Sequence, residues 1–304
     1  MRYFKYQEFT LRKLVSEKKD KGLTIGLALP VCNEEGTLGK TIEVIRSCGE
    51  LVDELIVIDS NSKDKSKAIC KKMGVSFVDD TRASKDLGVE LIRGKGWNLW
   101  ASLYYLNTDI IIWIDSDIEN ISKQFITGLV GPMIIDTKID FVKCYYERPK
   151  GDARVTEIMV RPFLNFFFPK TKNFVQPLSG EYGGRRSFLE QLFFSSGYGV
   201  EVSLLIQTSY RLRTTAYAQS YLGKRIHRLQ DVPALGRMGA SILYTLLHIA
   251  DEMNLISIKS RINKTLQQYT SSDGRNFIAV KFNVADQMLP PMITLKAYDA
   301  KFKK

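Results

Sequence analysis

Residues 109–117 read Asp-Ile-Ile-Ile-Trp-Ile-Asp-Ser-Asp, and this stretch decides the fold class. Five apolar residues stand between acidic ends. A short, unbroken apolar run bounded by polar residues is typical of a strand that is buried on both faces, as in the centre of a parallel sheet. The stretch therefore predicts an α/β fold whose central strand ends at residue 114.

Two carboxylates follow this strand, at the sheet edge where open α/β folds bind ligands. Because side chains alternate along an extended chain, Asp115 and Asp117 can share one direction while Ser116 points the other way. The two carboxylates repel unless positive charge stands between them, and a divalent cation carrying a nucleotide diphosphate supplies it. The alternative is a strand end and the N-cap of a helix that starts near Ser122, which is the commoner meaning of an isolated Asp-x-Asp.

The residues before the central strand predict strands alternating with helices. The expected strands cover residues 23–30, 53–59 and 75–78. Pro30 should end the first strand, because proline cannot continue a central ladder. Thr37 can begin the first helix, and Gly74 can close the second. This β-α-β-α-β order favours a mostly parallel sheet with right-handed crossovers.

The residues after the central strand predict a less regular half. Helices are expected over 123–136 and 154–168, strands over 139–147 and 214–226, a glycine-rich loop over 176–186, and mostly helix from 233 to about 270. The last part, from 276, is weakly patterned. We expect an α/β domain with a helical C-terminal extension.

Composition limits the class of protein. The 304 residues suffice for one large domain or one domain with an appendage. No apolar stretch approaches the roughly 20 residues that cross a bilayer, and the N-terminus has no signal-peptide core. The four cysteines are scattered without metal-ligand spacing. We therefore expect a cytoplasmic protein without a membrane span.

The net charge of +11 indicates an anionic partner. Nucleic acid, a membrane surface and small anions all fit, but no basic arm and no nucleic-acid motif stands out, so small anions are favoured. Lys95, between Gly94 and Gly96, can reach a phosphate from the start of a helix. The alternative for this motif is a turn with a solvated lysine.

The motifs form an ordered set along residues 23–228. They are Leu-Pro-x-x-Asn-Glu-Glu (29–35), Gly-Lys-Gly (94–96), Asp-Ser-Asp (115–117), Arg-Val-Thr-Glu (154–157), Gln-Pro-Leu-Ser-Gly-Glu-Tyr (176–182), Gly-Tyr-Gly-Val-Glu (197–201) and His-Arg (227–228). The first half resembles sugar-nucleotide-dependent glycosyltransferases of the GT-A fold. The whole set resembles the glucosyl-3-phosphoglycerate synthases.

This resemblance implies a retaining glycosyltransferase. Glucose would pass from a nucleoside-diphosphate glucose to the hydroxyl of D-3-phosphoglycerate, giving a precursor of glucosylglycerate, with Mg²⁺ or Mn²⁺ as cofactor. It also implies a Rossmann-like sheet and suggests a homodimer. We expect an N-terminal arm or helix (1–22), a nucleotide-sugar half (23–150), an acceptor half (151–232) and a mainly helical segment that is a possible dimer interface (233–304).

The resemblance also assigns residues by motif. Donor contacts would come from Pro30, Val31, Asn33, Glu34, Ser60, Lys95, Asp115, Ser116, Tyr198 and Glu201. Acceptor contacts would come from Arg154, Thr156, Ser179 and Arg228, and metal ligands from Asp117 and His227. The catalytic set would be Asp115, Asp117, Glu201 and Arg154. No covalent nucleophile is expected, because retaining enzymes of this fold are thought to react on one face of the sugar.

The chain departs from the family at the acceptor. Leu229 follows His-Arg where the family usually has asparagine, and Asp152 and Ala153 replace a glycine pair. A different acceptor, mannose in place of glucose, and UDP, GDP or ADP as the nucleotide all stay open. The competing classes are a nucleotidyltransferase, disfavoured by the acidic first loop; an inverting membrane-associated transferase, disfavoured by the missing Gln-x-x-Arg-Trp; and a nucleic-acid-binding protein.

Overall fold

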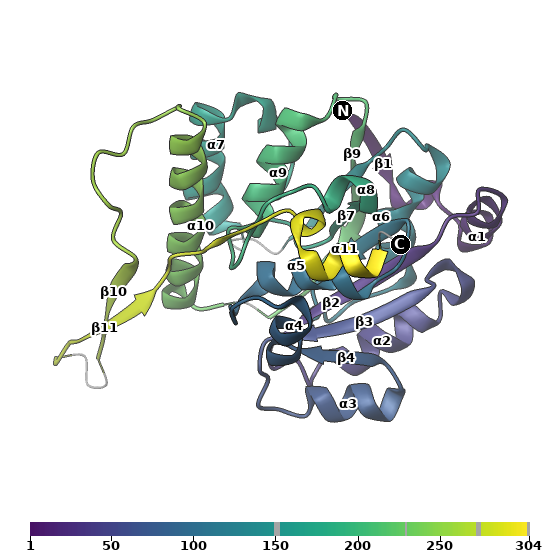
Figure 1. The fold of residues 1–304 in the computed structure, drawn as a ribbon, viewed down its shortest axis with the longest axis horizontal. Helices are drawn as coiled ribbons and strands as arrows, with labels where there is room; N and C mark the ends of the chain where they lie inside the picture. The colour runs from purple at the N-terminus through teal and green to yellow at the C-terminus, as the bar shows by residue number, and fades with distance from the viewer. Residues whose placement is uncertain (149–152, 229, 272–274, 303–304) are drawn as a thin grey trace.

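The computed structural model describes residues 1–148, 153–228, 230–271 and 275–302, and an eight-stranded sheet lies at its centre (Figure 1). In spatial order the strands are β1 (Arg2–Lys5), β9 (Tyr217–Lys224), β6 (Phe141–Glu147), β7 (Tyr182–Arg185), β5 (Ile110–Trp113), β2 (Ile25–Val31), β3 (Glu54–Asp59) and β4 (Ser76–Asp79). β7 runs antiparallel to both neighbours, and the other neighbours in this sheet pair in parallel. The predicted mostly parallel α/β sheet is confirmed.

β5 is the buried strand that its sequence predicts. Ile110 and Ile112 pack into the core on one face of the sheet, and Ile111 and Trp113 pack into the core on the other. All four side chains have no exposed surface. The alternation follows from the two-residue period of a strand, and it leaves Asp115 and Asp117 just beyond the end of the strand.

Helices cover both faces of the sheet (Figure 1). The core on one face contains side chains of α1 (Leu11–Asp20), α2 (Leu38–Arg46), α3 (Ser66–Met73) and α6 (Lys123–Ile135). The core on the other face contains side chains of α4 (Asp80–Leu87), α5 (Lys95–Tyr105), α7 (Arg161–Phe167), α8 (Arg186–Leu189), α9 (Val200–Arg211), α10 (Val232–Glu252) and α11 (Lys296–Phe302). A π-helical turn (Thr156–Val160) precedes α7, and 3₁₀ turns cover Tyr6–Glu8, Gly49–Leu51, Pro169–Thr171 and Met292–Thr294.

The C-terminal segment contains less helix than its sequence predicts. α10 ends at Glu252 and not near residue 270, because Asn254 takes a left-handed backbone (φ 57°) and the Leu255 amide bonds back to the Ala250 carbonyl. The chain then forms a hairpin of β10 (Thr265–Thr270) and β11 (Ile278–Asn283) that projects from the body (Figure 1).

After the hairpin the chain returns across the molecule to α11 (Figure 1). On the way β12 (Met288–Leu289) pairs antiparallel with β8 (Phe194–Ser195). A segment from the end of the sequence is thereby fixed to the residues that immediately precede the Gly-Tyr-Gly motif.

Two local predictions differ from the structure. Part of the expected glycine-rich loop forms β7, between β5 and β6. β2 continues one residue past Pro30, where Val31 still pairs with Asp59, while its pairing with β5 stops at Ala28. The Pro30 carbonyl faces the β5 side, where it accepts a hydrogen bond from the Ser116 hydroxyl (2.8 Å), so the missing proline N–H interrupts no ladder.

The N-terminal arm also contributes to the sheet. β1 pairs in parallel with β9, from Arg2 against Ala218 to Lys5 against Tyr221. Phe4 and Phe9 are buried and anchor this segment to the core. Within the described residues, no helix is both long and apolar enough to cross a bilayer.

Candidate active site

A cleft of about 870 Å³ lies at the carboxyl ends of β2, β3 and β5. Pro30, Ser60 and Asp115, which end or follow these three strands, contribute to its floor. Its other walls include residues from the Gly-Lys-Gly, Gly-Tyr-Gly and His-Arg motifs, among them Gly94, Lys95, Tyr198, Glu201, His227 and Arg228. The fold therefore gathers around one cavity the motifs that the sequence spreads over some 200 residues.

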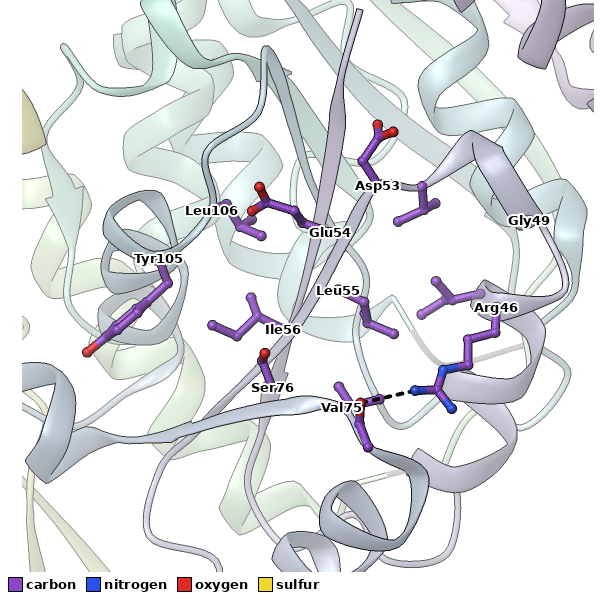
Figure 2. Close-up of a pocket in the computed structure, with 13 residues that line it drawn as sticks. Arg46, Gly49, Asp53, Glu54, Leu55, Ile56, Val75, Ser76, Tyr105 and Leu106 are labelled. Atoms are coloured by element: carbon purple, nitrogen blue, oxygen red, sulfur yellow. Dashed lines mark hydrogen bonds between the residues drawn. The ribbon is translucent and has the colours of Figure 1, made fainter. Parts of the chain in front are cut away.

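A second hollow, of about 520 Å³, lies at the opposite edge of the sheet, where β3 and β4 begin (Figure 2). Its most prominent cation, Arg46, already donates to the Gly74 carbonyl (3.2 Å). Ligands of open α/β sheets bind at the carboxyl ends of the strands, and the motif residues lie there, so we place the candidate active site in the larger cleft.

Lys95 joins two acidic motifs inside the cleft. Its ammonium lies 2.7 Å from Asp115 Oδ1 and 2.7 Å from Glu201 Oε1. Burial lowers the pKa of Lys95, but Asp115 and Glu201 outweigh burial and hold the pKa well above its usual range. Lys95 is therefore a permanent positive charge at the point where the Gly-Lys-Gly, Asp-Ser-Asp and Gly-Tyr-Gly motifs meet.

Arg225 is the second cation of this network. Its Nη2 lies 3.2 Å from Asp115 Oδ2 and 2.8 Å from Asp117 Oδ1, and its Nε lies 3.4 Å from Glu181 Oε1. Burial raises the pKa of Asp115, but Lys95 and then Arg225 reverse the effect and bring this pKa to about 2. Glu181 is fully buried, and burial raises its pKa despite Arg225. Asp115 is thus ionised over the whole physiological range.

The turn before β7 packs closely against the Asp115 carboxylate. A Cβ on Gly180 would come within 1.9 Å of Asp115 Oδ2, so a glycine is needed for this approach. The turn is held by Lys143, whose ammonium donates to the Ser179 carbonyl (2.6 Å) and lies 4.2 Å from the centre of the Tyr182 ring. Lys143 is 1% exposed, and burial lowers its pKa to about 7.

The loops that follow β2 and β3 are connected by hydrogen bonds. Asn33 adopts a left-handed backbone (φ 59°), its amide donates to Ser62, and its side-chain oxygen accepts from the Lys63 amide (2.7 Å). The Ser60 hydroxyl donates to the Asn98 side chain (3.1 Å), which itself donates to the Ile58 carbonyl. Polar atoms are therefore presented to the cleft on loops that hydrogen bonds hold in place.

Glu34 lies where the cleft adjoins a neighbouring hollow that Asn33 lines. Burial raises the pKa of Glu34, Asp117 raises it further, and Arg228, whose Nη2 lies 3.9 Å from the carboxylate, opposes them. Because its carboxylate faces the cleft, Glu34 can accept a hydrogen bond from a ligand hydroxyl.

Asp117 and His227 are brought together by a short antiparallel bridge. Ile118 pairs with His227, and the Asn120 side chain donates to the Lys224 carbonyl (2.8 Å) and accepts from the Ile226 amide (2.8 Å). A carboxylate and an imidazole are suitable ligands for Mn²⁺ or Mg²⁺ when ligand oxygens complete the shell. In the part of the chain that the structure describes, no group of three or more His, Cys, Asp or Glu side chains could hold an ion by itself. The pair therefore fits an ion that shares its ligands with a bound diphosphate.

The four residues expected at the acceptor lie in different surroundings. Thr156 lines the cleft, as does Arg228, whose side chain is 76% exposed. Arg154 is exposed and is not among the described lining residues. Ser179 is fully buried, and its hydroxyl donates to the Gln176 carbonyl (3.2 Å). Leu229 and Asp152 are outside the described residues.

Two groups of side chains were not predicted from the sequence. Arg93, Arg148 and Arg237 line the cleft and add positive charge to it. Arg225 and Glu181 form the base of the ion network, although Glu181 stands inside the 176–182 motif and Arg225 lies two residues before the His-Arg motif. The sequence signal for these two residues was that Arg225 is close to His227 and that Glu181 follows Gly180. Sequence spacing alone does not indicate that a buried carboxylate faces an arginine more than 40 positions away.

Comparisons with known proteins place this geometry in a family context. A family model for glycosyl transferase family 2 matches residues 27–194. The chain is 36% identical to the glucosyl-3-phosphoglycerate synthase of Petrotoga mobilis, over 100% of its own length and 97% of that protein.

Two crystal structures resemble it closely. The glucosyl-3-phosphoglycerate synthase of Mycobacterium tuberculosis, in complex with Mn²⁺, UDP-glucose and phosphoglyceric acid, has a TM-score of 0.83 at 36% identity, with 94% of this chain and 95% of that one covered. The mannosyl-3-phosphoglycerate synthase of Rubrobacter xylanophilus has a TM-score of 0.89 at 26% identity, with 96% and 97% covered.

Proposed function

The chain belongs to the glucosyl-3-phosphoglycerate synthases, within glycosyl transferase family 2, and from this premise we propose that it transfers glucose from UDP-glucose to D-3-phosphoglycerate with a divalent ion as cofactor. The fold is the GT-A type that the sequence predicted. The mycobacterial relative contains the same donor, Mn²⁺ and phosphoglyceric acid in its crystals.

One observation carries the proposal. Lys95 lies 2.7 Å from both Asp115 and Glu201, and Asp115 shares Arg225 with Asp117. This network connects the strand end that would receive a nucleotide with the Gly-Tyr-Gly helix that would receive a sugar. A site that transfers a sugar from a nucleotide needs both halves in one cleft.

We propose the following roles on the donor side. Glu34 and Ser60 would accept from or donate to the nucleoside, and Lys95 would place its ammonium against the diphosphate. Asp117 and His227 would hold the divalent ion, which supplies positive charge against the departing diphosphate. Tyr198, whose ring is partly exposed at the cleft, and Glu201 would contact the sugar.

The arrangement of the carboxylates supports the expectation that no covalent nucleophile is used. Asp115 and Glu201 are each bonded to the same ammonium, and Asp115 is also bonded to Arg225. A carboxylate that is held by two cations is a poor nucleophile, because the cations stabilise its charge. This arrangement suits electrostatic support of a reaction on one face of the sugar, with retention of configuration.

We assign the acceptor to the side of the cleft near the π-helical turn. Thr156, in this turn, and Arg228 both line the cleft, and Arg93, Arg148 and Arg237 add further positive charge around the cavity. A substrate with a carboxylate and a phosphate would be attracted by such a cleft. We keep Arg154 as a proposed acceptor residue. For Ser179 we propose an indirect role, in shaping the turn that supports Asp115.

The direct test is product formation. Purified protein would be incubated with UDP-glucose, ADP-glucose, GDP-glucose or GDP-mannose and with 3-phosphoglycerate, in Mg²⁺ or Mn²⁺ and in chelator, and products would be resolved by mass spectrometry and proton NMR. We expect α-configured glucosyl-3-phosphoglycerate from UDP-glucose, abolished by chelator. Hydrolysis of the nucleotide sugar without transfer would reject 3-phosphoglycerate as the acceptor.

The resemblance to the mannosyl-3-phosphoglycerate synthase supports a second candidate, a mannosyl donor. The two sugars differ at the 2-hydroxyl, which a pocket reads through a few hydrogen bonds. The same panel separates the two functions, because a mannosyl enzyme would use GDP-mannose at least as well as UDP-glucose.

We also propose a cytoplasmic location, which the four free cysteines support. A homodimer that uses the segment from residue 233 onward remains our proposal, as does the division of the catalytic domain into a nucleotide half up to residue 150 and an acceptor half up to residue 232.

A further inference from the structure

The Gly-Lys-Gly and Gly-Tyr-Gly motifs are held together through their backbones. The Gly96 amide donates to the Gly197 carbonyl (3.2 Å), and the Trp97 amide donates to the Ser196 carbonyl (2.8 Å). α5 begins at Lys95, and α9 begins one residue after Gly199. The loop 195–199 therefore sets where Lys95 and Glu201 stand relative to each other.

This loop is fixed by residues from the end of the chain. The Ser196 amide donates to the Gln287 carbonyl (2.8 Å), and the Gln287 amide donates to the Ser196 hydroxyl (2.9 Å). The pairing of β12 with β8 and a bond from the Trp100 indole to the Pro290 carbonyl (2.8 Å) extend the attachment. We use the name C-terminal strap for residues 284–290.

Asp286 is the central side chain of the strap. Its Oδ2 accepts from the Ser195 hydroxyl (2.7 Å), from the Gly199 amide (2.8 Å) and, at 3.4 Å, from Thr245, and its Oδ1 accepts from Ser241 (2.7 Å). The carboxylate thus connects the loop to α10. It also accepts from the Gly199 amide just before α9, where the helix N-terminus favours negative charge.

The loop is shaped to receive this carboxylate. A Cβ on Gly197 would come within 2.2 Å of Asp286 Oδ1, so the motif glycine makes room for the acid. Both carboxylate oxygens are occupied by donors from the protein. Asp286 also lines the cleft, but these four donors hold its carboxylate, so we assign its effect on the site to the loop.

We propose that Asp286 is a positioning residue for sugar transfer: through the loop 195–199 it holds Tyr198 and Glu201 in register with Lys95. The proposed nucleotide loops at Glu34, Ser60 and Asp117 follow β2, β3 and β5, and within the described residues the hydrogen bonds of Asp286 go to Ser195, Gly199, Ser241 and Thr245 instead. This inference rests on the proposed function, and it divides the site into a nucleotide part that is independent of the strap and a sugar part that depends on it.

The test compares Asp286→Ala and Asp286→Asn with Asp251→Asn. Asp251 is a matched control, because it is also an acid that accepts from a backbone amide (Ile258, 2.9 Å) at α10, away from the loop. For Asp286→Ala we expect kcat to fall roughly ten- to hundredfold, since misplacement of about 1 Å has such an effect. The Kd for UDP should stay within about twofold, as for independent sites.

Asp286→Asn should lie between the wild type and Asp286→Ala, and Asp251→Asn should match the wild type in kcat. Amide hydrogen exchange adds a readout that does not need turnover: exchange at Gly96, Trp97 and Gly199 should accelerate in the Asp286 variants and not in Asp251→Asn. If Asp286→Ala does not fold, Asp286→Asn and Ser241→Ala carry the same comparison.

Unchanged kcat in a folded Asp286 variant would overturn the inference. So would a loss of UDP affinity in proportion to the loss of kcat, because that pattern indicates a general structural role. A wild-type protein that binds UDP but shows no transfer would reject the proposed function instead. The exchange rates at Gly96, Trp97 and Gly199 would then decide by themselves whether Asp286 positions the loop.

Discussion

Asp115 lies between Lys95 and Arg225, while Asp117 is paired with Arg225 and its side chain is 30% exposed. The two acids of one motif therefore have different surroundings. The enclosed carboxylate supports the network, and the more accessible one can take a ligand from the cleft. We expect their substitutions to differ accordingly.

Asp117→Ala should abolish most of the metal-dependent turnover without unfolding the protein. We expect kcat to fall on the order of a hundred- to a thousandfold, since the variant loses an ion ligand and the electrostatic support that the ion gives. Turnover measured across a Mn²⁺ titration, with circular dichroism for folding, checks this. Glu119→Ala, an exposed acid two residues away, is the control, and full activity in Asp117→Ala would remove the metal assignment.

Arg154→Ala should raise the KM for 3-phosphoglycerate roughly tenfold or more and leave the KM for the nucleotide sugar nearly unchanged. The reason is the loss of a charge-assisted hydrogen bond to the acceptor. Steady-state kinetics with each substrate varied in turn checks the split, with the exposed Arg82→Ala as the control. The opposite split would mean that the two halves of the cleft are misassigned.

Lys143 should make stability depend on pH. Its pKa is about 7 in the folded protein and near its ordinary 10.5 in the unfolded chain, so between these values only the unfolded chain holds the proton. Stability should therefore rise with pH across this window, by at most about 1.4 kcal/mol per pH unit from this group.

Urea denaturation of wild type and Lys143→Met between pH 7 and 9 measures this term as the difference between their slopes. The exposed Lys138→Met should keep the wild-type slope. Equal slopes for wild type and Lys143→Met would show that Lys143 stays charged in the fold.

Sequence predicted one side of the ion network and missed the other. Asp115, Lys95 and Glu201 come from separate motifs, and in the fold both carboxylates lie 2.7 Å from the Lys95 ammonium. Arg225 and Glu181 were missed because a buried ion pair leaves no periodic pattern. Glu181 precedes β7 and Arg225 follows β9, and these strands lie on either side of β6 only in the folded sheet.

At the scale of elements, β5 and its parallel neighbours were predictable because their apolar runs are buried on both faces. β7 was not, because Gly183 and Gly184 occupy its centre and glycine disfavours strands. The close approach of neighbouring backbone explains them: a Cβ on Gly183 would meet the Ile111 carbonyl at 2.5 Å. A tertiary contact, absent from the local sequence, overrides the local preference here.

The turn before β7 should be intolerant of any side chain. Gly180→Ala would drive a methyl group into Asp115 Oδ2, so either the turn or the carboxylate must move. We expect a loss of activity on the order of a hundredfold and a loss of stability of about 1–3 kcal/mol. Kinetics and chemical denaturation check both, and Gly36→Ala, whose Cβ would meet nothing within 4 Å, is the control. Wild-type kinetics in Gly180→Ala would contradict the tight packing.

At the scale of the whole molecule, the hairpin of β10 and β11 exposes apolar side chains far from the sheet. Tyr269, Phe277 and Ile278 are each more than 60% exposed. The spacing of the C-terminal residues did not predict this hairpin, because most of its strand residues are exposed and follow no apolar alternation. The apolar spacing of α10, a helix of 21 residues, dominated the hydrophobic pattern of this segment.

If the proposed homodimer uses this segment, serine at Tyr269, Phe277 and Ile278 should shift the protein toward monomer. The reason is the removal of apolar surface that a partner would cover. Light scattering coupled to gel filtration measures the mass, and UDP affinity should stay unchanged. Phe166→Ser, on the exposed face of α7, is the control. A monomeric wild type would reject the dimer, and dissociation by Phe166→Ser alone would move the interface.

The two ends of the chain are both fixed late in synthesis. Arg2 pairs with Ala218, so a ribosome adding 5–20 residues per second delivers the partner strand of β1 roughly ten seconds or more after β1 itself. The strap comes later still. A nascent chain that has not yet reached Asp286 already includes Glu34, Ser60 and Asp117 but lacks the side chain that holds the loop 195–199. On the roles proposed above, binding of the nucleotide would become possible during synthesis before transfer of the sugar, which would need Asp286.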